Sequence, residues 1–249
     1  NELMPRVKSL DELPSPYTAG LMDKFFDGVL IPMIHTTRGC PFKCSFCTEG
    51  TQYYDKVAKR TTLSDDLEYI GQRRGSILDL YITDANFGMF KEDADKADAI
   101  AAVQNEYNWP QYIHVSGGKN HKERVLDVAR RIGGRMGVAA SLQSTNQTVL
   151  DNVRRSNIST EQLADVARSG SKIDANTYAE IILNLPGDTT EAHTQSLRDA
   201  VNTGLSYLRM YQLILLPETD MNTLIDDIGA EITNSGVSDG LAGGRTQRN

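Results

Sequence analysis

Three cysteines, Cys40, Cys44 and Cys47, are the only ones in the 249-residue chain and lie within eight residues. Their spacing is C-x3-C-x2-C. An odd number of thiols in one short segment is a poor disulfide framework. The same arrangement suits a soft metal or an iron–sulfur centre in a reducing compartment, because both prefer thiolate ligands. The sequence therefore points to metal-based chemistry at residues 40–47.

Two interpretations of these thiols differ in the fourth ligand. A 4Fe–4S cluster held entirely by protein uses four Cys, so three would leave one iron free to bind a small molecule. The alternative is a structural zinc site with His35 or another side chain as the fourth ligand. Zinc sites usually combine two paired motifs, and no second Cys pair follows here. The spacing favours the cluster and leaves the zinc site open.

Short apolar runs alternate with helix patterns from residue 29 onward, and this alternation indicates the fold class. The strand-like runs cover residues 29–34, 77–82, 112–115, 137–142, 178–185 and 205–216. Between them, apolar residues recur at helical spacing. Repeated strand–helix units predict an α/β protein with a parallel sheet and right-handed crossovers. Eight units would close a barrel, so six predict an open, partial (β/α)6 barrel of the TIM type. Pro32 in the first run favours an edge strand.

Charge and hydropathy exclude several classes of function. The chain has 26 Lys and Arg against 33 Asp and Glu, a net charge of -7. This acidic balance argues against nucleic-acid binding, which needs a concentrated basic field. No apolar run approaches the roughly 20 residues of a membrane span, and the polar N-terminus is unlike a secretory leader. The sequence predicts a cytoplasmic protein without nucleic-acid or membrane partners.

The composition also suggests how the chain is divided. Residues 1–28 have three prolines and little periodicity, and we interpret them as a linker from an N-terminal domain upstream of Asn1. Residues 29–216 would form the barrel. Residues 217–249 end in a Gly-rich stretch and are expected to be a C-terminal extension, truncated or mobile.

The cysteine motif, with the aromatic Phe46 before its last Cys and a strand before its first, resembles that of the radical S-adenosylmethionine (SAM) superfamily. The resemblance extends from the first to the sixth strand. It implies a partial barrel in which Cys40, Cys44 and Cys47 hold a 4Fe–4S cluster, SAM chelates the open iron, and Phe46 lies near the adenine. It further implies that SAM is cleaved reductively to a 5′-deoxyadenosyl radical, with an external one-electron reductant such as flavodoxin or ferredoxin.

Five segments resemble the cobalamin-binding branch of this superfamily: LDELPSPY, ITDANFGMF, SLQSTN, EIILNLPGDT and YQLILLPETD. The branch implies cobalamin, bound by a domain absent from this chain, and C-methylation or radical rearrangement of a small-molecule substrate. Two positions depart from the family pattern: Asp84-Ala85-Asn86 replaces a GGE motif, and Glu218 stands where a Gly is usual. The alternatives are a cobalamin-independent enzyme, methylthiotransferase-like or peptide-modifying, and a non-enzymatic zinc-knot or electron-transfer module.

Polar residues near strand ends are the candidate SAM contacts, since catalytic groups of barrels lie at that face. Asp84 and Asn86 could accept hydrogen bonds from the SAM ammonium, with an Asx turn as the alternative. Ser141 and Gln143 could contact the ribose, or they could be ordinary polar residues. Glu180 lies in an apolar strand, where an unpaired carboxylate is costly, so it either faces the site or pairs with an Arg.

No general acid or base follows from the sequence. His35, His114, His121 and His193 are isolated, and structural roles are expected for them. The GGKN segment at 117–120 could contact a cofactor or substrate, but a Gly turn with a solvated Lys is slightly favoured.

Overall fold

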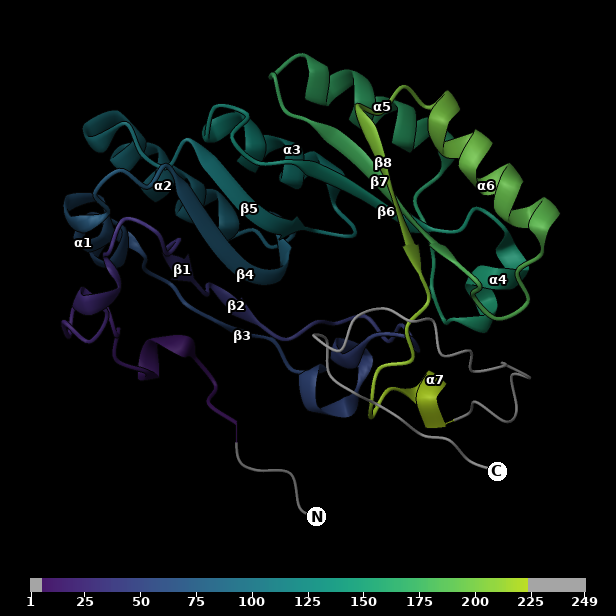
Figure 1. Cartoon of the computed structure of the whole chain (residues 1–249), viewed down its shortest axis with the longest axis horizontal. Coiled ribbons are helices and arrows are strands. Elements are labelled where there is room, and N and C mark those ends of the chain that lie inside the picture. Colours follow the sequence, from purple (N-terminus) through teal and green to yellow (C-terminus); the bar gives the residue numbers. More distant parts are fainter. Residues whose placement is uncertain (1–5, 224–249) are drawn as a thin grey trace.

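The computed structural model describes residues 6–223, which form an open parallel α/β barrel with its helices along the outer side (Figure 1). The parallel strands are β1 (Met33–Ile34), β4 (Asp79–Phe87), β5 (Tyr112–Gly117), β6 (Val138–Gln143), β7 (Thr177–Leu183) and β8 (Tyr207–Gln212). The helices are α1 (Ser64–Arg73), α2 (Asp93–Tyr107), α3 (Lys122–Arg131), α4 (Gln147–Asn152), α5 (Thr160–Ser171), α6 (Thr190–Asn202) and α7 (Asp220–Thr223). The predicted six-strand alternation is confirmed. None of the helices described here is long and apolar enough to cross a membrane.

The sheet consists of two three-stranded halves, with the orders β1-β4-β5 and β6-β7-β8, and every pairing in them is parallel. Between β5 and β6 the contact is a single bridge, in which the Ile113 N–H donates to the Arg135 carbonyl at 3.0 Å. Further along this seam the Lys122 ammonium donates to the carbonyls of Gly118 and Ala139, at 2.6 Å each. A lysine side chain therefore supplies hydrogen bonds where the two halves meet.

Alternation along the strands decides which side chains face the helices. In β4, Leu80 and Ile82 are buried and join the core that packs on α1, α2 and α3. A smaller core that includes Leu142 and Ile181 lies under α5 and α6. The intervening residues point to the interior of the barrel, where Tyr81 is 44% exposed. The interior is thus left open rather than filled with apolar side chains.

The structure differs from the expected elements mainly at the first strand. Residues 29–32 are not strand, because the Asp27 carboxylate accepts hydrogen bonds from the N–H groups of Val29 and Leu30 and forms a turn. Only Met33–Ile34 pairs with β4, at the edge of its half-sheet. β4 continues through Asp84 and Asn86, so these two residues lie within a strand.

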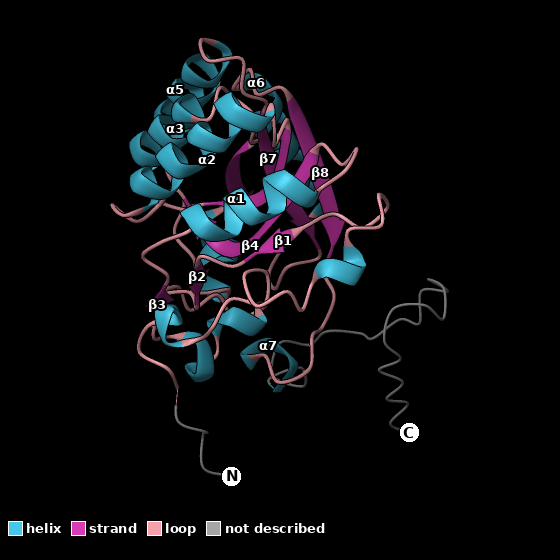
Figure 2. Cartoon of the chain, turned by 90° about the vertical axis from the view of Figure 1, so that its left-hand side faces the viewer, coloured by secondary structure: helices cyan, strands magenta, loops and turns pink. Residues whose placement is uncertain are grey.

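Several short elements were not expected from the sequence. Among them are α4, α7 and the antiparallel pair β2 (Thr37–Arg38) and β3 (Ala58–Lys59), and the two-residue strands are too short to produce a pattern. Figure 2 shows β2, β3 and α7 below the main strands. Of the expected C-terminal extension, residues 224–249 lie outside the described residues.

Candidate cofactor site at the carboxyl ends of the strands

The cysteine loop follows β2 and is folded tightly against its neighbours. Gly39 has φ +105°, and a Cβ there would lie 2.8 Å from the carbonyl oxygens of Tyr54 and Lys56. The next N–H, of Cys40, donates to the Tyr54 carbonyl at 2.9 Å. Gly50 packs directly on the carbonyl of Cys44. Side chains at these two glycines would push the loop open, so the chain path around the thiols depends on them.

Three cationic or amide donors from separate segments point at two of the thiols. Asn86 Nδ2 lies 3.2 Å from Cys40 Sγ, and Lys119 Nζ lies 3.8 Å from the same sulfur. Arg155 Nη1 lies 3.5 Å from Cys44 Sγ. Both sulfurs belong to buried residues, 1% and 3% exposed. Donors of this kind stabilise negative charge on sulfur, as thiolate ligands of a cluster require.

Three thiolates are the number that a cubane cluster with one open iron uses. Among the described residues, no three His, Cys, Asp or Glu side chains are grouped as ligands of a single metal. A cubane cluster carries each thiolate on a different iron, so its ligands need not converge on one point. Burial raises the pKa of the Cys47 thiol, and the nearby Lys119 ammonium opposes that rise.

Asp84 has partners other than the one expected. Its carboxylate accepts hydrogen bonds from the N–H of Thr36 at 2.7 Å, from the N–H of Thr37 at 3.0 Å, and from the Thr36 hydroxyl. Asp84 is 2% exposed, and burial raises the pKa of its carboxyl despite these bonds. The structure therefore places Asp84 under the segment that leads into the cysteine loop. Its contact with a SAM ammonium stays a prediction.

Asn86 lies at the thiols, and its amide is used on both sides, while its predicted contact with the SAM ammonium stays a prediction. Besides donating to Cys40, it accepts from the N–H of Lys119 at 3.4 Å. Lys119 is half-buried, with its Nζ 5.3 Å from the centre of the Phe42 ring. The slightly favoured interpretation of GGKN as a turn with a solvated Lys is therefore wrong. Arg155 was missed, since an Arg in a polar stretch gives no signal in the sequence.

The other candidate SAM contacts, Ser141, Gln143 and Phe46, differ in their surroundings. Ser141 accepts a hydrogen bond from Arg155 through its carbonyl oxygen, which links the end of β6 to Cys44. Gln143 is buried in a left-handed conformation at φ +65°. Phe46 packs against an apolar cluster of Val149, Val153, Leu185 and Met221. The contacts of these residues with SAM stay predictions.

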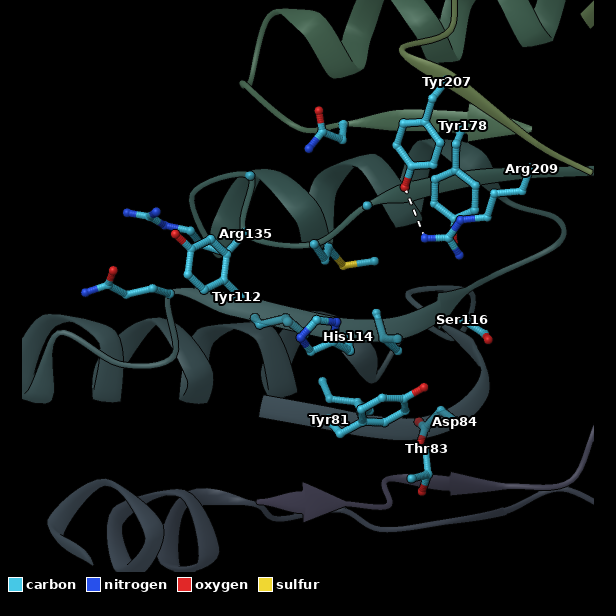
Figure 3. A pocket seen from close by; sticks show the side chains of 18 of the residues that line it. Tyr81, Thr83, Asp84, Tyr112, His114, Ser116, Arg135, Tyr178, Tyr207 and Arg209 are labelled. Carbon is cyan, nitrogen blue, oxygen red and sulfur yellow. Dashed lines mark hydrogen bonds between the residues drawn. The ribbon is translucent and has the colours of Figure 1, made fainter. Parts of the chain in front are cut away.

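Beside this site, a cavity of about 710 Å³ occupies the interior of the barrel (Figure 3). Tyr81 stacks on His114 with ring centres 5.6 Å apart, and Tyr178 stacks on Tyr207 at 5.0 Å. Glu180 faces this cavity and makes no ion pair within the described chain. Its contact with a bound cofactor or substrate stays a prediction. Of the four histidines expected to have structural roles, His114 lines this cavity and bonds Asp79 at 2.7 Å, and His193 bonds Asp188 at 3.2 Å.

The family follows from a match to known sequences. Residues 34–200, more than half of the chain, match the sequence profile of the radical SAM superfamily. The chain is a radical SAM protein. In this family a 4Fe–4S cluster and SAM are the cofactors, and Cys40, Cys44 and Cys47 are the thiols here that fit the cluster. Thiols and cationic donors at one end of the strands, with an open cavity beside them, can hold a cluster next to a substrate.

Two curated relatives of this chain are methyltransferases. The chain is 31% identical over 239 residues to the cobalamin-dependent radical SAM methyltransferase TokK of Streptomyces tokunonensis, covering 88% of this chain and 34% of the relative. It is 29% identical over 224 residues to the 2-(S-pantetheinyl)-carbapenam-3-carboxylate methyltransferase of Streptantibioticus cattleyicolor, covering 85% and 33%. This chain thus spans about a third of the length of these relatives.

A solved structure shows the same fold. The radical SAM methyltransferase TsrM of Kitasatospora setae, with cobalamin and a 4Fe–4S cluster bound, superposes with a TM-score of 0.67 at 19% identity. The match covers 79% of this chain and 37% of TsrM. At this identity the likeness concerns the fold, and it agrees with the partial barrel described above.

Proposed function

We propose that this chain is the catalytic core of a cobalamin-dependent radical SAM methyltransferase that acts on carbon in a small molecule. The proposal is supported by the two curated relatives, both methyltransferases, one of them named as cobalamin-dependent. The observation that carries it is the set of donors from Asn86, Lys119 and Arg155 on buried thiols, beside an open cavity. A related radical rearrangement is the second outcome of the same chemistry.

In this proposal Cys40, Cys44 and Cys47 hold the cluster, and the donors beside them limit the build-up of negative charge. When bound, the cluster, SAM and cobalamin supply one-electron and methyl-transfer chemistry, while the protein positions reactants and excludes water. Cobalamin would be held by a part of the protein outside this chain. The electron would come from an external reductant such as flavodoxin or ferredoxin, in the cytoplasm, where free thiols persist.

The proposal also assigns the SAM contacts. Asn86 would be oriented toward the SAM ammonium, and Asp84 would hold the Thr36–Thr37 segment beneath it. Ser141 and Gln143, at the end of β6, would contact the ribose. The backbone near Phe46 would lie along the adenine, while its ring stays in the apolar cluster. Glu180 would face the bound molecules from β7.

Metal content after anaerobic reconstitution tests the first half of the proposal. The protein should turn brown and hold about four irons and four sulfides, and Cys44→Ser should lose most of this iron. Ser45→Ala is the matched control, because Ser45 is buried in the same loop and its hydroxyl has no hydrogen-bond partner. One zinc per chain without sulfide would favour the zinc-knot alternative and contradict the proposal.

Product analysis tests the second half. With reductant, cobalamin and a substrate, SAM should yield 5′-deoxyadenosine together with S-adenosylhomocysteine. 5′-Deoxyadenosine alone, unchanged by omitting cobalamin, would instead indicate a cobalamin-independent type, peptide-modifying or methylthiotransferase-like. A loaded cluster with no SAM turnover would favour an electron-transfer module.

A further inference from the structure

Two stacked aromatic pairs lie on opposite walls of the interior cavity, and in the second pair Tyr207 is 39% exposed whereas Tyr178 is 4% exposed. Tyr81 and His114 come from β4 and β5, and Tyr178 and Tyr207 come from β7 and β8 (Figure 3). Ring pairs of this kind favour a flat partner, since offset stacking adds to apolar burial. The volume of about 710 Å³ lies within the range of pockets for small organic ligands.

Arg209 of β8 lies on one of these faces. Its guanidinium carbon is 4.4 Å from the centre of the Tyr178 ring and 5.4 Å from that of Tyr207. Its Nη2 donates to the Tyr207 hydroxyl at 3.3 Å. The side chain of Tyr211 also interacts with this guanidinium, and no carboxylate of the described residues lies within 4.0 Å of it. An Arg held flat on rings retains most of its donors for a ligand.

Three acidic residues line the cavity, Asp84, Asp174 and Glu180, and none of them forms an ion pair with Arg209. Asp79 is bonded to His114, and Asp84 to Thr36 and Thr37. Glu180 is paired in register with Arg209 on the neighbouring strand, yet the two form no ion pair, because the guanidinium leans back over Tyr178. A planar cation is therefore presented to the cavity beside aromatic rings.

The cavity also reaches the cofactor site. Asp84 and Ser116 line one end of it, and Asn86, which donates to Cys40, follows two residues after Asp84, a step of about 7 Å along a strand. A molecule between the ring pairs would therefore extend toward the thiols. The ring pairs themselves lie in the amino-terminal halves of their strands, with Tyr81 five residues before Asn86, so such a molecule would span about 17 Å along the strand to reach the thiols.

We propose that the cavity binds a ring-shaped substrate carrying an anionic oxygen group, and that Arg209 is the residue that binds this group. The inference rests on the proposed function in so far as that function requires a small-molecule substrate. The ring would lie between the pairs Tyr81–His114 and Tyr178–Tyr207. A carboxylate would match the guanidinium through two parallel hydrogen bonds, and a phosphate group offers the same chemistry.

Binding of indole-2-carboxylate and of its methyl ester tests this proposal. The titrations use the cluster-loaded protein without reductant, so no turnover is needed. The wild-type protein should bind the acid at least about tenfold more tightly than the ester, because hydrogen bonds between charged groups are strong. In Arg209→Gln the two affinities should become equal, and Arg209→Lys should retain part of the preference. Competition by phenyl phosphate or by benzoate then distinguishes a phosphate from a carboxylate ligand.

Two further variants separate a binding role from a structural one. Arg73→Gln removes an arginine that also stacks on a tyrosine, Tyr69, but on the outer surface of α1, and it should keep the full preference for the acid. Tyr207→Leu should weaken the acid and the ester by similar factors, through loss of stacking.

Three results would overturn the inference: equal affinity of the wild-type protein for acid and ester, an unchanged preference in Arg209→Gln, or no binding of either probe. The proposed function could still hold in each case, since iron content and SAM products are measured separately. Conversely, a protein without SAM turnover that still shows the Arg209-dependent preference would retain the cavity assignment and lose the proposed reaction.

Discussion

Lys122 at the seam between the two half-sheets should make the stability of this protein depend on alkaline pH. It is 8% exposed, and its ammonium donates to the carbonyls of Gly118 and Ala139. Burial, together with the nearby Arg155 cation, lowers the pKa of Lys122 from 10.5 to about 8, although Glu180 opposes the change. The folded protein therefore holds this proton less tightly than the unfolded chain does.

The sign and size of the effect follow from proton linkage. Above pH 8 the unfolded chain binds more protons than the folded protein, so stability rises with pH until about 10.5. At about 1.4 kcal/mol per pKa unit, the shift corresponds to about 3 kcal/mol in total. Between about pH 7.5 and about pH 9.5, the free energy of unfolding should rise by about 2 kcal/mol of this total.

Urea unfolding across this pH range measures the effect. Trp109 is the only tryptophan and is fully buried, so its fluorescence reports unfolding. The free energy of unfolding of the wild-type protein, minus that of Lys122→Met, should rise by about 2 kcal/mol over the range. Lys172→Met, at an exposed position after α5, should run parallel to the wild type. A constant difference between wild type and Lys122→Met would refute the reasoning.

Two further substitutions test the loop that carries the thiols. Asp84→Ala should lower the free energy of unfolding by about 3 kcal/mol or more, because two backbone N–H groups and a hydroxyl lose a buried charged acceptor. The midpoints of urea unfolding measure this loss. The control Asp165→Ala, which removes an exposed ion pair, should barely change the midpoint. Gly50→Ala should reduce iron uptake several-fold, because the added Cβ would collide with the Cys44 carbonyl. Iron analysis of the reconstituted protein measures the uptake. In the control Gly117→Ala the atom nearest to the added Cβ is 3.7 Å away, and equal uptake by the two variants would contradict the collision.

Elements that depend on hydrogen bonds and spacing between neighbouring residues could be predicted from the sequence. Ser159 and Gln162 have the spacing of a capping box, and both reciprocal hydrogen bonds are present at the start of α5. Apolar residues recur at helical spacing within 63–70 and 125–132, where α1 and α3 form. By contrast, the expected strand at 29–34 is short, because the Asp27 side chain competes for backbone N–H groups. Such competition depends on one side-chain conformation and leaves no periodic signal.

The sequence alone determined the thiol spacing, the strand–helix alternation and hence the family, because these properties are carried by neighbours along the chain. The tertiary structure decided which groups meet the thiols: Lys119 and Arg155 reach Cys40 and Cys44 across 79 and 111 residues. It also decided that Asp84 serves Thr36 and Thr37, and that Arg209 lies on Tyr178 without a carboxylate partner. Side chains alternate between the two faces of a strand, so the position of a residue in the strand decides which face its side chain takes. Its partners, however, are set by the register and curvature of strands that are distant in sequence.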